Sequence, residues 1–238
     1  KPVYGVYSTF VQRTYDQLQQ DLCINNNPIT ILTFAASVWG MNDVTHLGIY
    51  DIPMMSNIPN LVYLAPTTYE EYIAMLDWST EQREHPVAIR VPGAVIHGEK
   101  PTKDYGILNK YETVQKGSGA AIIALGTFFG MGKQAAELIE KKTGVKPTLI
   151  DPVYITGIDE ELLESLKKNH KAVVTLEDGI LDGGFGEKIA RFYGDSDMRT
   201  VNFGLKKEFL DRYDANEVLR QNCLTPEQIA DRAVELIK

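Results

Sequence analysis

The sequence predicts an α/β protein built of two consecutive three-layer domains, each with a mostly parallel sheet. Short, almost wholly apolar segments alternate with longer amphipathic segments along the chain. This alternation is interrupted once, over residues 92–118, by a stretch rich in glycine, proline, lysine and glutamate, and it restarts at residue 120. Apolar strands separated by helices are typical of parallel sheets that are covered on both faces.

In the first half, four apolar segments predict strands. The helix expected over 10–24 carries Val11, Tyr15, Leu18 and Leu22 at spacings of four, three and four, which gives it one apolar face. The Asn25–Pro28 stretch ends it. The expected strands are 3–8, 29–34, 61–65 and 86–91, and further helices are expected over 51–57 and from Pro66 to about Arg83, with a loop over 35–50.

The second half repeats the pattern. Its last helix opens on Thr225-Pro226-Glu227, a capping residue followed by proline in the first turn. The expected strands are 120–127, 147–151, 172–177 and 199–204, the expected helices are 130–142, 159–169 and 184–193, and an edge strand is expected around 110–115. We therefore predict a first domain over 1–93, a linker over 94–118 and a second domain over 119–238.

Composition narrows the possible partners. The net charge of −8 argues against nucleic acid or an anionic membrane surface as the main partner. No apolar run approaches the roughly 20 residues that span a bilayer. Two distant cysteines, Cys23 and Cys223, without a Cys-x-x-Cys pair or a histidine cluster, predict a reducing cytoplasm and no metal site. Lys1-Pro2 followed at once by a strand reads as the interior of a longer polypeptide.

Two glycine-rich turns could suggest phosphate binding. In residues 124–140, five residues separate Gly126 from Gly132 and Gln134 stands where a P-loop needs Ser or Thr, so a tight strand-to-helix turn is expected instead. In residues 177–190 the acidic side chains would repel an anion, and this turn is expected to lie against another domain or subunit.

Residues that could bind a ligand gather after the first two strands. Tyr7, Phe10 and Arg13 place two aromatic rings and a cation at a strand's carboxyl end, which suggests a flat partner. His46 lies in a loop after the second strand, where open α/β sheets bind ligands, and its imidazole could relay a proton or form a structural hydrogen bond. The other three histidines are expected on the surface.

Five segments along the chain follow one another in a recognisable order: "VYGVYSTFVQRTYDQLQQDLC", "THLGIYDI", "PVAIRVPG", "LIDPVYITGIDEELLESL" and "VVTLEDGILDGGFG". Together they resemble the 1-deoxy-D-xylulose-5-phosphate synthases, which are thiamine-diphosphate-dependent members of the transketolase superfamily. The resemblance covers the whole chain but only the C-terminal part of such an enzyme. It implies most of a pyrimidine-binding domain, truncated at its N-terminus, followed by a complete transketolase C-terminal domain.

The resemblance also implies roles for individual residues. Phe10 would stack on the aminopyrimidine ring of thiamine diphosphate, Tyr7 and Arg13 would line the same cleft, and His46 would be catalytic. Arg90 would hold the acceptor's phosphate, and Asn42 would contact substrate. The magnesium ligands and the catalytic glutamate of the family would lie outside this chain, so the fragment alone is expected to be inactive.

The chain departs from the family pattern at several of these positions. Ala35 replaces a second phosphate-binding arginine, and Asn42 replaces an aspartate, with Asp43 one residue later. Val153 and Thr156 replace an arginine and a lysine in the second domain. These departures leave the acceptor open.

The expected substrates are a sugar phosphate or 2-oxo acid and an aldehyde, in a homodimer. Two alternatives remain: the smaller subunit of a split transketolase or a 2-oxo-acid dehydrogenase β chain, and a non-catalytic paralogue that acts as a binding module.

Overall fold

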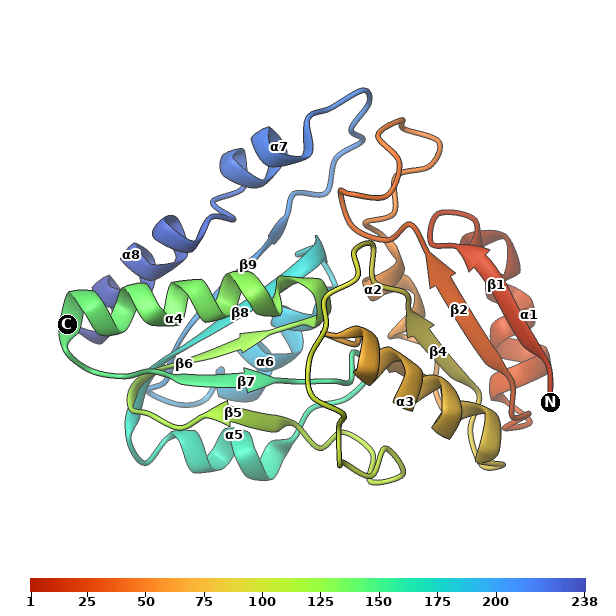
Figure 1. The fold of residues 1–238 in the computed structure, drawn as a ribbon, viewed down its shortest axis with the longest axis horizontal. Helices are drawn as coiled ribbons and strands as arrows, with labels where there is room; N and C mark the ends of the chain where they lie inside the picture. Colours follow the sequence, from red (N-terminus) through yellow and green to blue (C-terminus); the bar gives the residue numbers. More distant parts are fainter.

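The computed structural model describes all residues 1–238 and contains two α/β units joined side by side. Figure 1 shows the N-terminus on the outer edge of the first unit and the C-terminus at the far end of the second. The predicted fold class is confirmed, because each unit has one sheet with helices on both faces. No helix is both long and apolar enough to cross a membrane.

The first sheet is entirely parallel, with the strand order β1-β2-β4-β3. Its strands are β1 (Val3–Tyr7), β2 (Thr30–Phe34), β3 (Val62–Leu64) and β4 (Val87–Arg90). Helix α3 (Tyr69–Glu81) packs on one face through Met75, against Leu32 and Ile89. Helix α2 (Asp51–Met55) and the segment after β1 cover the other face.

The predicted helix over 10–24 is present but irregular. It consists of η1 (Val11–Thr14, 3₁₀), α1 (Tyr15–Gln17) and η2 (Leu18–Cys23, π-helical). In the last part, the amide of Ile24 donates to the carbonyl of Gln19, five residues back. The wider turn lets Leu18 and Cys23, five residues apart, both enter the core, so tertiary packing overrides regular helical spacing here.

The second sheet has the order β5-β7-β6-β8-β9 and is parallel except for its β5–β7 pair. Its strands are β5 (Glu112–Gln115), β6 (Gly119–Ala124), β7 (Thr148–Asp151), β8 (His170–Ile180) and β9 (Arg199–Leu205). The short turn η3 (Gly126–Phe128) leads into α4. Its helices are α4 (Phe129–Thr143), α5 (Glu160–Leu166), α6 (Phe185–Tyr193), α7 (Ala215–Gln221) and α8 (Pro226–Ile237).

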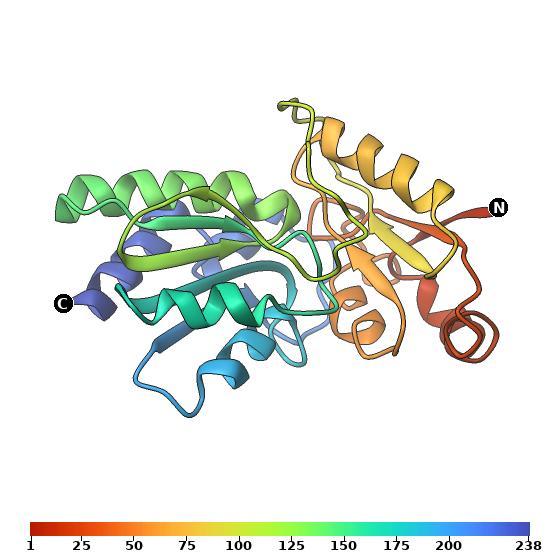
Figure 2. The same cartoon turned by 90° about the horizontal axis from the view of Figure 1, so that it is seen from below.

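Side-chain alternation along the central strand explains the three layers. In β6, Ile122 and Ala124 face the cluster that contains α4, α7 and α8, whereas Ala121 and Ile123 face the cluster that contains α5 and α6. Figure 2 shows α4 on one side of the sheet and α5 and α6 on the other. Helix α7 was not predicted, although Asp214 and Glu217 have the spacing of a capping box and the Asp214 side chain accepts a hydrogen bond from the Glu217 amide.

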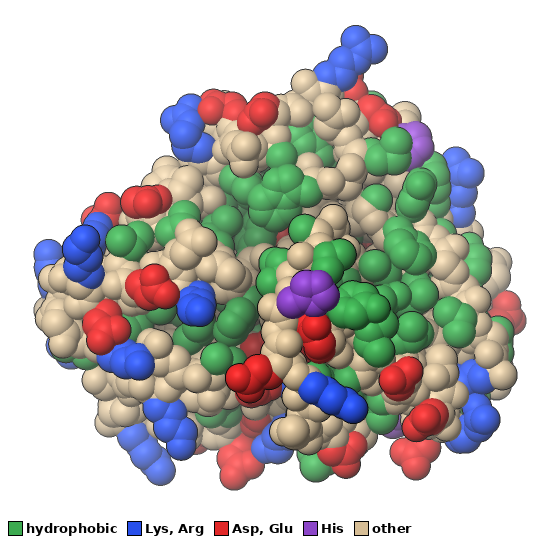
Figure 3. Space-filling model, viewed as in Figure 1, with side chains coloured by type: hydrophobic (Ala, Val, Ile, Leu, Met, Phe, Trp, Pro, Cys, Tyr) green, Lys and Arg blue, Asp and Glu red, His purple; other side chains and the backbone are tan.

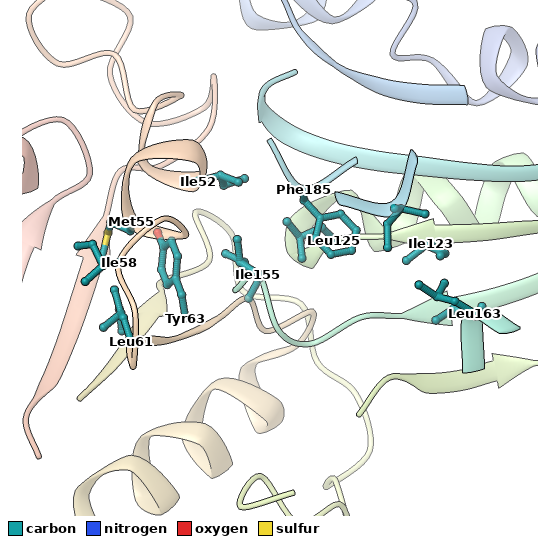
Figure 4. Close-up of a cluster of buried hydrophobic side chains, with 14 of the residues drawn as sticks. Ile52, Met55, Ile58, Leu61, Tyr63, Ile123, Leu125, Ile155, Leu163 and Phe185 are labelled. Atoms are coloured by element: carbon teal, nitrogen blue, oxygen red, sulfur yellow. The ribbon is translucent and has the colours of Figure 1, made fainter. Parts of the chain in front are cut away.

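The two units share one hydrophobic core and a short run of backbone pairing. The amide of Ala65 donates to the carbonyl of Val153 (2.9 Å), and the amide of Ile155 donates to the carbonyl of Tyr63 (2.8 Å). Residues 153–155 therefore extend the edge of β3. In Figure 4, Ile155 lies between Tyr63 of the first unit and Phe185 of the second. The expectation of a turn that lies against another domain is also met within residues 177–190, because Gly179 packs against Ile52 of α2.

The interruption predicted over 94–118 separates the two sheets, since β4 ends at Arg90 and β5 begins at Glu112. The predicted edge strand exists as β5 and pairs with β7, so this part of the linker joins the second sheet. We propose a first domain over 1–93, a linker over 94–118 and a second domain over 119–238.

The prediction that His170 lies on the surface is wrong. The residue is buried at the start of β8, where Nε2 lies 2.8 Å from the hydroxyl of Thr148 and Nδ1 lies 3.0 Å from the carbonyl of Leu166. A carbonyl only accepts, so Nδ1 carries the proton, and Nε2 accepts from Thr148. The ring is therefore held neutral.

We expect His170 to make the protein less stable in acid. Burial lowers the pKa of His170 from 6.5. The unfolded chain then binds a proton as the pH falls below about 6.5, before the folded chain does, and stability is lost in that window. Urea unfolding at pH 7.5 and 5.5 should show a smaller acid-induced loss for His170→Gln than for the wild type. The control His97→Gln, at an exposed imidazole, should leave the loss unchanged, and an equal loss in all three proteins would contradict the assignment.

Candidate active site

Four predicted site residues gather at the carboxyl end of β1. The ring of Phe10 lies 6.0 Å from that of Tyr7 and 5.1 Å, edge-on, from the imidazole of His46. The guanidinium carbon of Arg13 lies 5.3 Å from the centre of the Phe10 ring. Tyr7 is 46% exposed and Phe10 is half-buried, so both rings can be reached from solvent. We call Tyr7, Phe10, Arg13 and His46 the aromatic cluster.

The local backbone explains why these side chains meet. The amide of Ser8 donates to the carbonyl of Phe34 (2.7 Å), which continues the β1–β2 pairing by one residue. The amide of Phe10 then donates to the carbonyl of Tyr7 (2.8 Å), which closes a turn. The chain thereby reverses at the edge of the sheet where parallel strands end and ligands commonly bind.

His46 is oriented by its own loop. Its Nδ1 lies 2.9 Å from Oδ1 of Asp43, which also accepts hydrogen bonds from the hydroxyl and the amide of Thr45. The Thr45 side chain, followed by that of His46, lowers the pKa of Asp43 to about 2, so this group accepts as a carboxylate. An ionised Asp43 favours the proton on Nδ1, which leaves Nε2 free to take or give a proton.

The second domain holds the loop that carries His46 by hydrogen bonds. The amide of Val44 donates to the Asp211 carboxylate (3.2 Å), and the amide of Arg212 donates to the carbonyl of Asn42 (2.6 Å). The hydroxyl of Tyr213 lies 3.1 Å from the carbonyl oxygen of Met41. Figure 1 shows the two loops meeting at the upper edge of the molecule. The position of His46 therefore depends on both domains.

A cavity of about 380 Å³ lies between the two domains. Its walls come from the carboxyl ends of β2, β3 and β4 and from the η3 turn and β8 of the second domain. Arg90 and Asp178 are the charged side chains in its lining, and most of the remainder is apolar or hydroxyl-bearing. We call this space the junction cavity. On the face seen in Figure 3, hydrophobic side chains gather near the middle and over the half formed by the first domain, and charged side chains lie mainly towards the periphery.

Arg90 is buried at the inner wall of the junction cavity and is held by two acids. Its Nε donates to Oδ2 of Asp51 (2.7 Å), its Nη2 donates to Oδ1 of the same residue (3.2 Å), and its Nη1 donates to Asp178. The hydroxyls of Tyr63 and Thr127 donate to the two carboxylates, Tyr63 to Asp51 and Thr127 to Asp178 at 2.8 Å. Burial, followed by the Asp51 charge, raises the pKa of Tyr63 well above its usual range, so it remains a donor.

Sequence reasoning found Arg90 but missed both of its acidic partners. Asp51 begins α2, and Asp178 lies in β8, so the contact joins residues that are far apart in the chain. Asp178 follows an apolar run in the sequence. An acidic residue at the end of such a run could have indicated a buried partner for Arg90. The resulting ion-pair network ties the first domain to the second.

The structure separates the other predicted positions from the junction cavity. Asn42 lines a neighbouring hollow that it shares with Tyr213. Ala35 has a positive φ of 53° and does not line the junction cavity. Thr156 accepts a hydrogen bond from the amide of Tyr63 (3.3 Å), so this departure from the family pattern serves the domain contact. The structure contains no group of three or more His, Cys, Asp or Glu side chains placed to hold a metal.

Comparison with known families matches both halves of the chain. The pattern of the transketolase pyrimidine binding domain covers residues 1–95, and that of the transketolase C-terminal domain covers residues 109–229. The two matches correspond to the two sheets described above.

Curated relatives include several enzymes named 1-deoxy-D-xylulose-5-phosphate synthase. The protein of Clostridium perfringens (strain SM101 / Type A) is 35% identical over 243 residues and aligns with 100% of this chain and 39% of its own length. Those of Shouchella clausii and Acaryochloris marina are 33% and 31% identical, each over 100% of this chain and 38% of the relative. The chain therefore spans less than two-fifths of these proteins.

Solved structures agree on the fold. A split-gene transketolase, described as an inactive β4 tetramer, superposes with a TM-score of 0.84 at 21% identity, over 100% of this chain and 77% of that chain. A Pichia stipitis transketolase in complex with sedoheptulose 7-phosphate gives a TM-score of 0.77 at 17% identity, over 99% of this chain and 34% of that chain. With both domain patterns matched along its length, the chain belongs to the transketolase family.

Proposed function

We propose that this chain is the C-terminal part of a thiamine-diphosphate-dependent transferase similar to 1-deoxy-D-xylulose-5-phosphate synthase. The enzyme would move a two-carbon unit from a 2-oxo acid or sugar phosphate to an aldehyde. The aromatic cluster carries this proposal, because it places a flat ring, a cation and an oriented histidine together at the carboxyl end of a parallel strand. Similarity to the synthases over the whole chain supports it.

The residues present fit the pyrimidine end of the cofactor. Phe10 offers a partly exposed aromatic face for a flat heteroaromatic ring. The hydroxyl of Ser8, two residues earlier, is buried and has no hydrogen-bond partner, which a polar ring edge would supply. Thiamine diphosphate supplies carbanion chemistry when bound. Phe10 would hold its ring, Tyr7 and Arg13 would border it, and Nε2 of His46 would move a proton to or from the substrate.

Other parts of the proposal come from the family resemblance. These are the magnesium ion, with its ligands outside this chain, the homodimer, the cytoplasmic location and the inactivity of the isolated chain. The roles of Arg90 and Asn42 as substrate contacts also belong here. Because Arg90 is already held by Asp51 and Asp178, we assign it to the wall of the substrate site.

The experiment is the replacement of Phe10 by alanine in the full-length polypeptide. We expect thiamine diphosphate binding to weaken by about 1–3 kcal/mol, because stacking and buried apolar area are lost. Calorimetric titration of both proteins with the cofactor measures the difference. Tyr69→Ala is the matched control, since Tyr69 is 44% exposed and packs on His97, outside the aromatic cluster.

Each outcome of this titration has a consequence. Equal affinity of wild type and Phe10→Ala would contradict the assignment of Phe10. A full-length protein that binds no thiamine diphosphate would favour the non-catalytic paralogue. The 238-residue chain tested alone should show no turnover of pyruvate, and measurable turnover would show that it needs no further domain.

A further inference from the structure

Trp39 lies between two spaces at the contact of the two domains. It lines the junction cavity and also the neighbouring hollow that contains Asn42, and it is the one residue common to both linings. The hollow has a volume of about 500 Å³ and is otherwise lined by the rest of residues 38–42 and by residues 213–215 of the second domain. A side chain that borders two adjoining spaces closes each of them on one side, so Trp39 forms the wall between them.

The second domain holds the Trp39 ring in place. The centre of the ring lies 5.7 Å from that of Phe128, and the two planes meet at 75°, the edge-to-face arrangement that aromatic rings favour. Phe128 ends the η3 turn and is fully buried, so it is a fixed support. Trp39 itself is 47% exposed, which leaves part of its surface free to meet a ligand.

The backbone on both sides of Trp39 is also fixed. The hydroxyl of Tyr213 lies 3.1 Å from the carbonyl oxygen of Val38 and 3.1 Å from that of Met41. A Cβ atom on Gly40 would lie 2.3 Å from the carbonyl oxygen of Ala35, so the chain makes a turn too tight for any side chain there. Trp39 therefore cannot move aside unless the loop breaks its contacts with the second domain.

The position of Trp39 explains why two predicted substrate contacts lie apart. Arg90 lines the junction cavity, whereas Asn42 lines the hollow on the other side of the Trp39 wall. A ligand chain that grows along the junction cavity towards the hollow would meet the indole ring. Because that ring is held by Phe128 and by the loop, each further carbon atom would have to displace protein atoms.

We propose that Trp39 is a specificity-determining residue that ends the junction cavity and thereby sets the longest aldehyde that the enzyme accepts. The inference rests on the proposed function, since the ligand concerned is the aldehyde acceptor. The indole ring acts through its volume, so the limit concerns the length of the acceptor and not its charge.

The test is steady-state kinetics of the full-length polypeptide with pyruvate as donor and unbranched aldehydes of three to eight carbon atoms as acceptors. For the wild type, kcat/KM should fall at least tenfold at one step of the series. Trp39→Ala should move this fall to a chain at least two carbon atoms longer, and Trp39→Phe, which keeps most of the ring, should move it less. Met41→Ala is the control, because it enlarges the hollow but leaves the wall, and its chain-length profile should match the wild type.

A binding measurement separates this inference from the proposed function. Affinities for unbranched alcohols of three to eight carbon atoms, measured by saturation-transfer NMR, need no turnover. Affinity should rise about fourfold per buried methylene up to the limit in the wild type, and for at least two further carbon atoms in Trp39→Ala. If no aldehyde is turned over while the alcohol limit moves in this way, only the proposed function is overturned. An equal limit in both proteins, no limit in the wild type, or no binding of any alcohol would overturn the assignment of Trp39.

Discussion

Replacing Arg90 with methionine should lower the free energy of unfolding by about 3–5 kcal/mol, because two buried carboxylates lose their common cation. Asp51 and Asp178 are almost wholly removed from solvent, and their remaining donors, Tyr63 and Thr127, are neutral hydroxyls. Because Asp51 and Asp178 belong to different domains, we expect the substitution to weaken the contact between the two domains. Equilibrium unfolding in urea, followed by circular dichroism, measures it.

The control for this experiment is an arginine whose ion pair is exposed. Arg220 pairs with Glu217 on α7, with 65% and 46% of the two side chains exposed. Arg220→Met should cost less than about 1 kcal/mol, since solvent screens surface pairs. Similar losses in the two variants would show that the Arg90 network is not a significant part of the domain contact.

Under the proposed transferase function, replacing His46 with alanine should lower kcat of the full-length polypeptide about 100- to 10,000-fold, the usual contribution of a positioned acid–base group. The reason is the free Nε2, which faces away from the Asp43 bond that holds the other ring nitrogen. Steady-state turnover at saturating cofactor measures the effect. His85→Ala is the control, because His85 is a partly buried histidine that lines a separate cavity.

The Asp43→Asn variant tests whether Asp43 orients the His46 ring or only supports the loop that carries it. It keeps the size of the side chain but removes the carboxylate that favours the proton on Nδ1. Its kcat should fall less than that of His46→Ala, and the pH dependence of kcat should shift. An unchanged pH profile would mean that Asp43 only supports the loop, and full activity of His46→Ala would contradict a catalytic role for His46.

Local sequence patterns were sufficient for most of the fold. Apolar strands such as 29–34 and 86–91 appear where they were predicted, because a strand buried on both faces carries mostly apolar residues. The motif around Phe10 also contains three of the four residues of the aromatic cluster. Tyr7, Phe10 and Arg13 lie within seven residues, so their proximity follows from one strand and one turn.

Long-range contacts could not be derived in this way. The regular helix expected over 10–24 has a π-helical end because Leu18 and Cys23 must both reach the core. His170 was expected on the surface, yet the Thr148 hydroxyl and the Leu166 carbonyl bury and pair it. Each of these outcomes depends on an element that packs from elsewhere in the chain.

The amino-acid sequence by itself thus determined the two α/β units, the order of their strands and of most of their helices, and the grouping of Tyr7, Phe10 and Arg13, because these follow from periodicity and one local motif. His46 joins this group only through the fold of its loop, which the second domain contacts. Only the tertiary structure decided the state of Arg90. The sequence shows a lone arginine at the end of a strand, whereas folding brings Asp51 and Asp178 onto it from positions 39 and 88 residues away. A buried cation needs compensating acids, and in this protein only the fold brings those acids beside it.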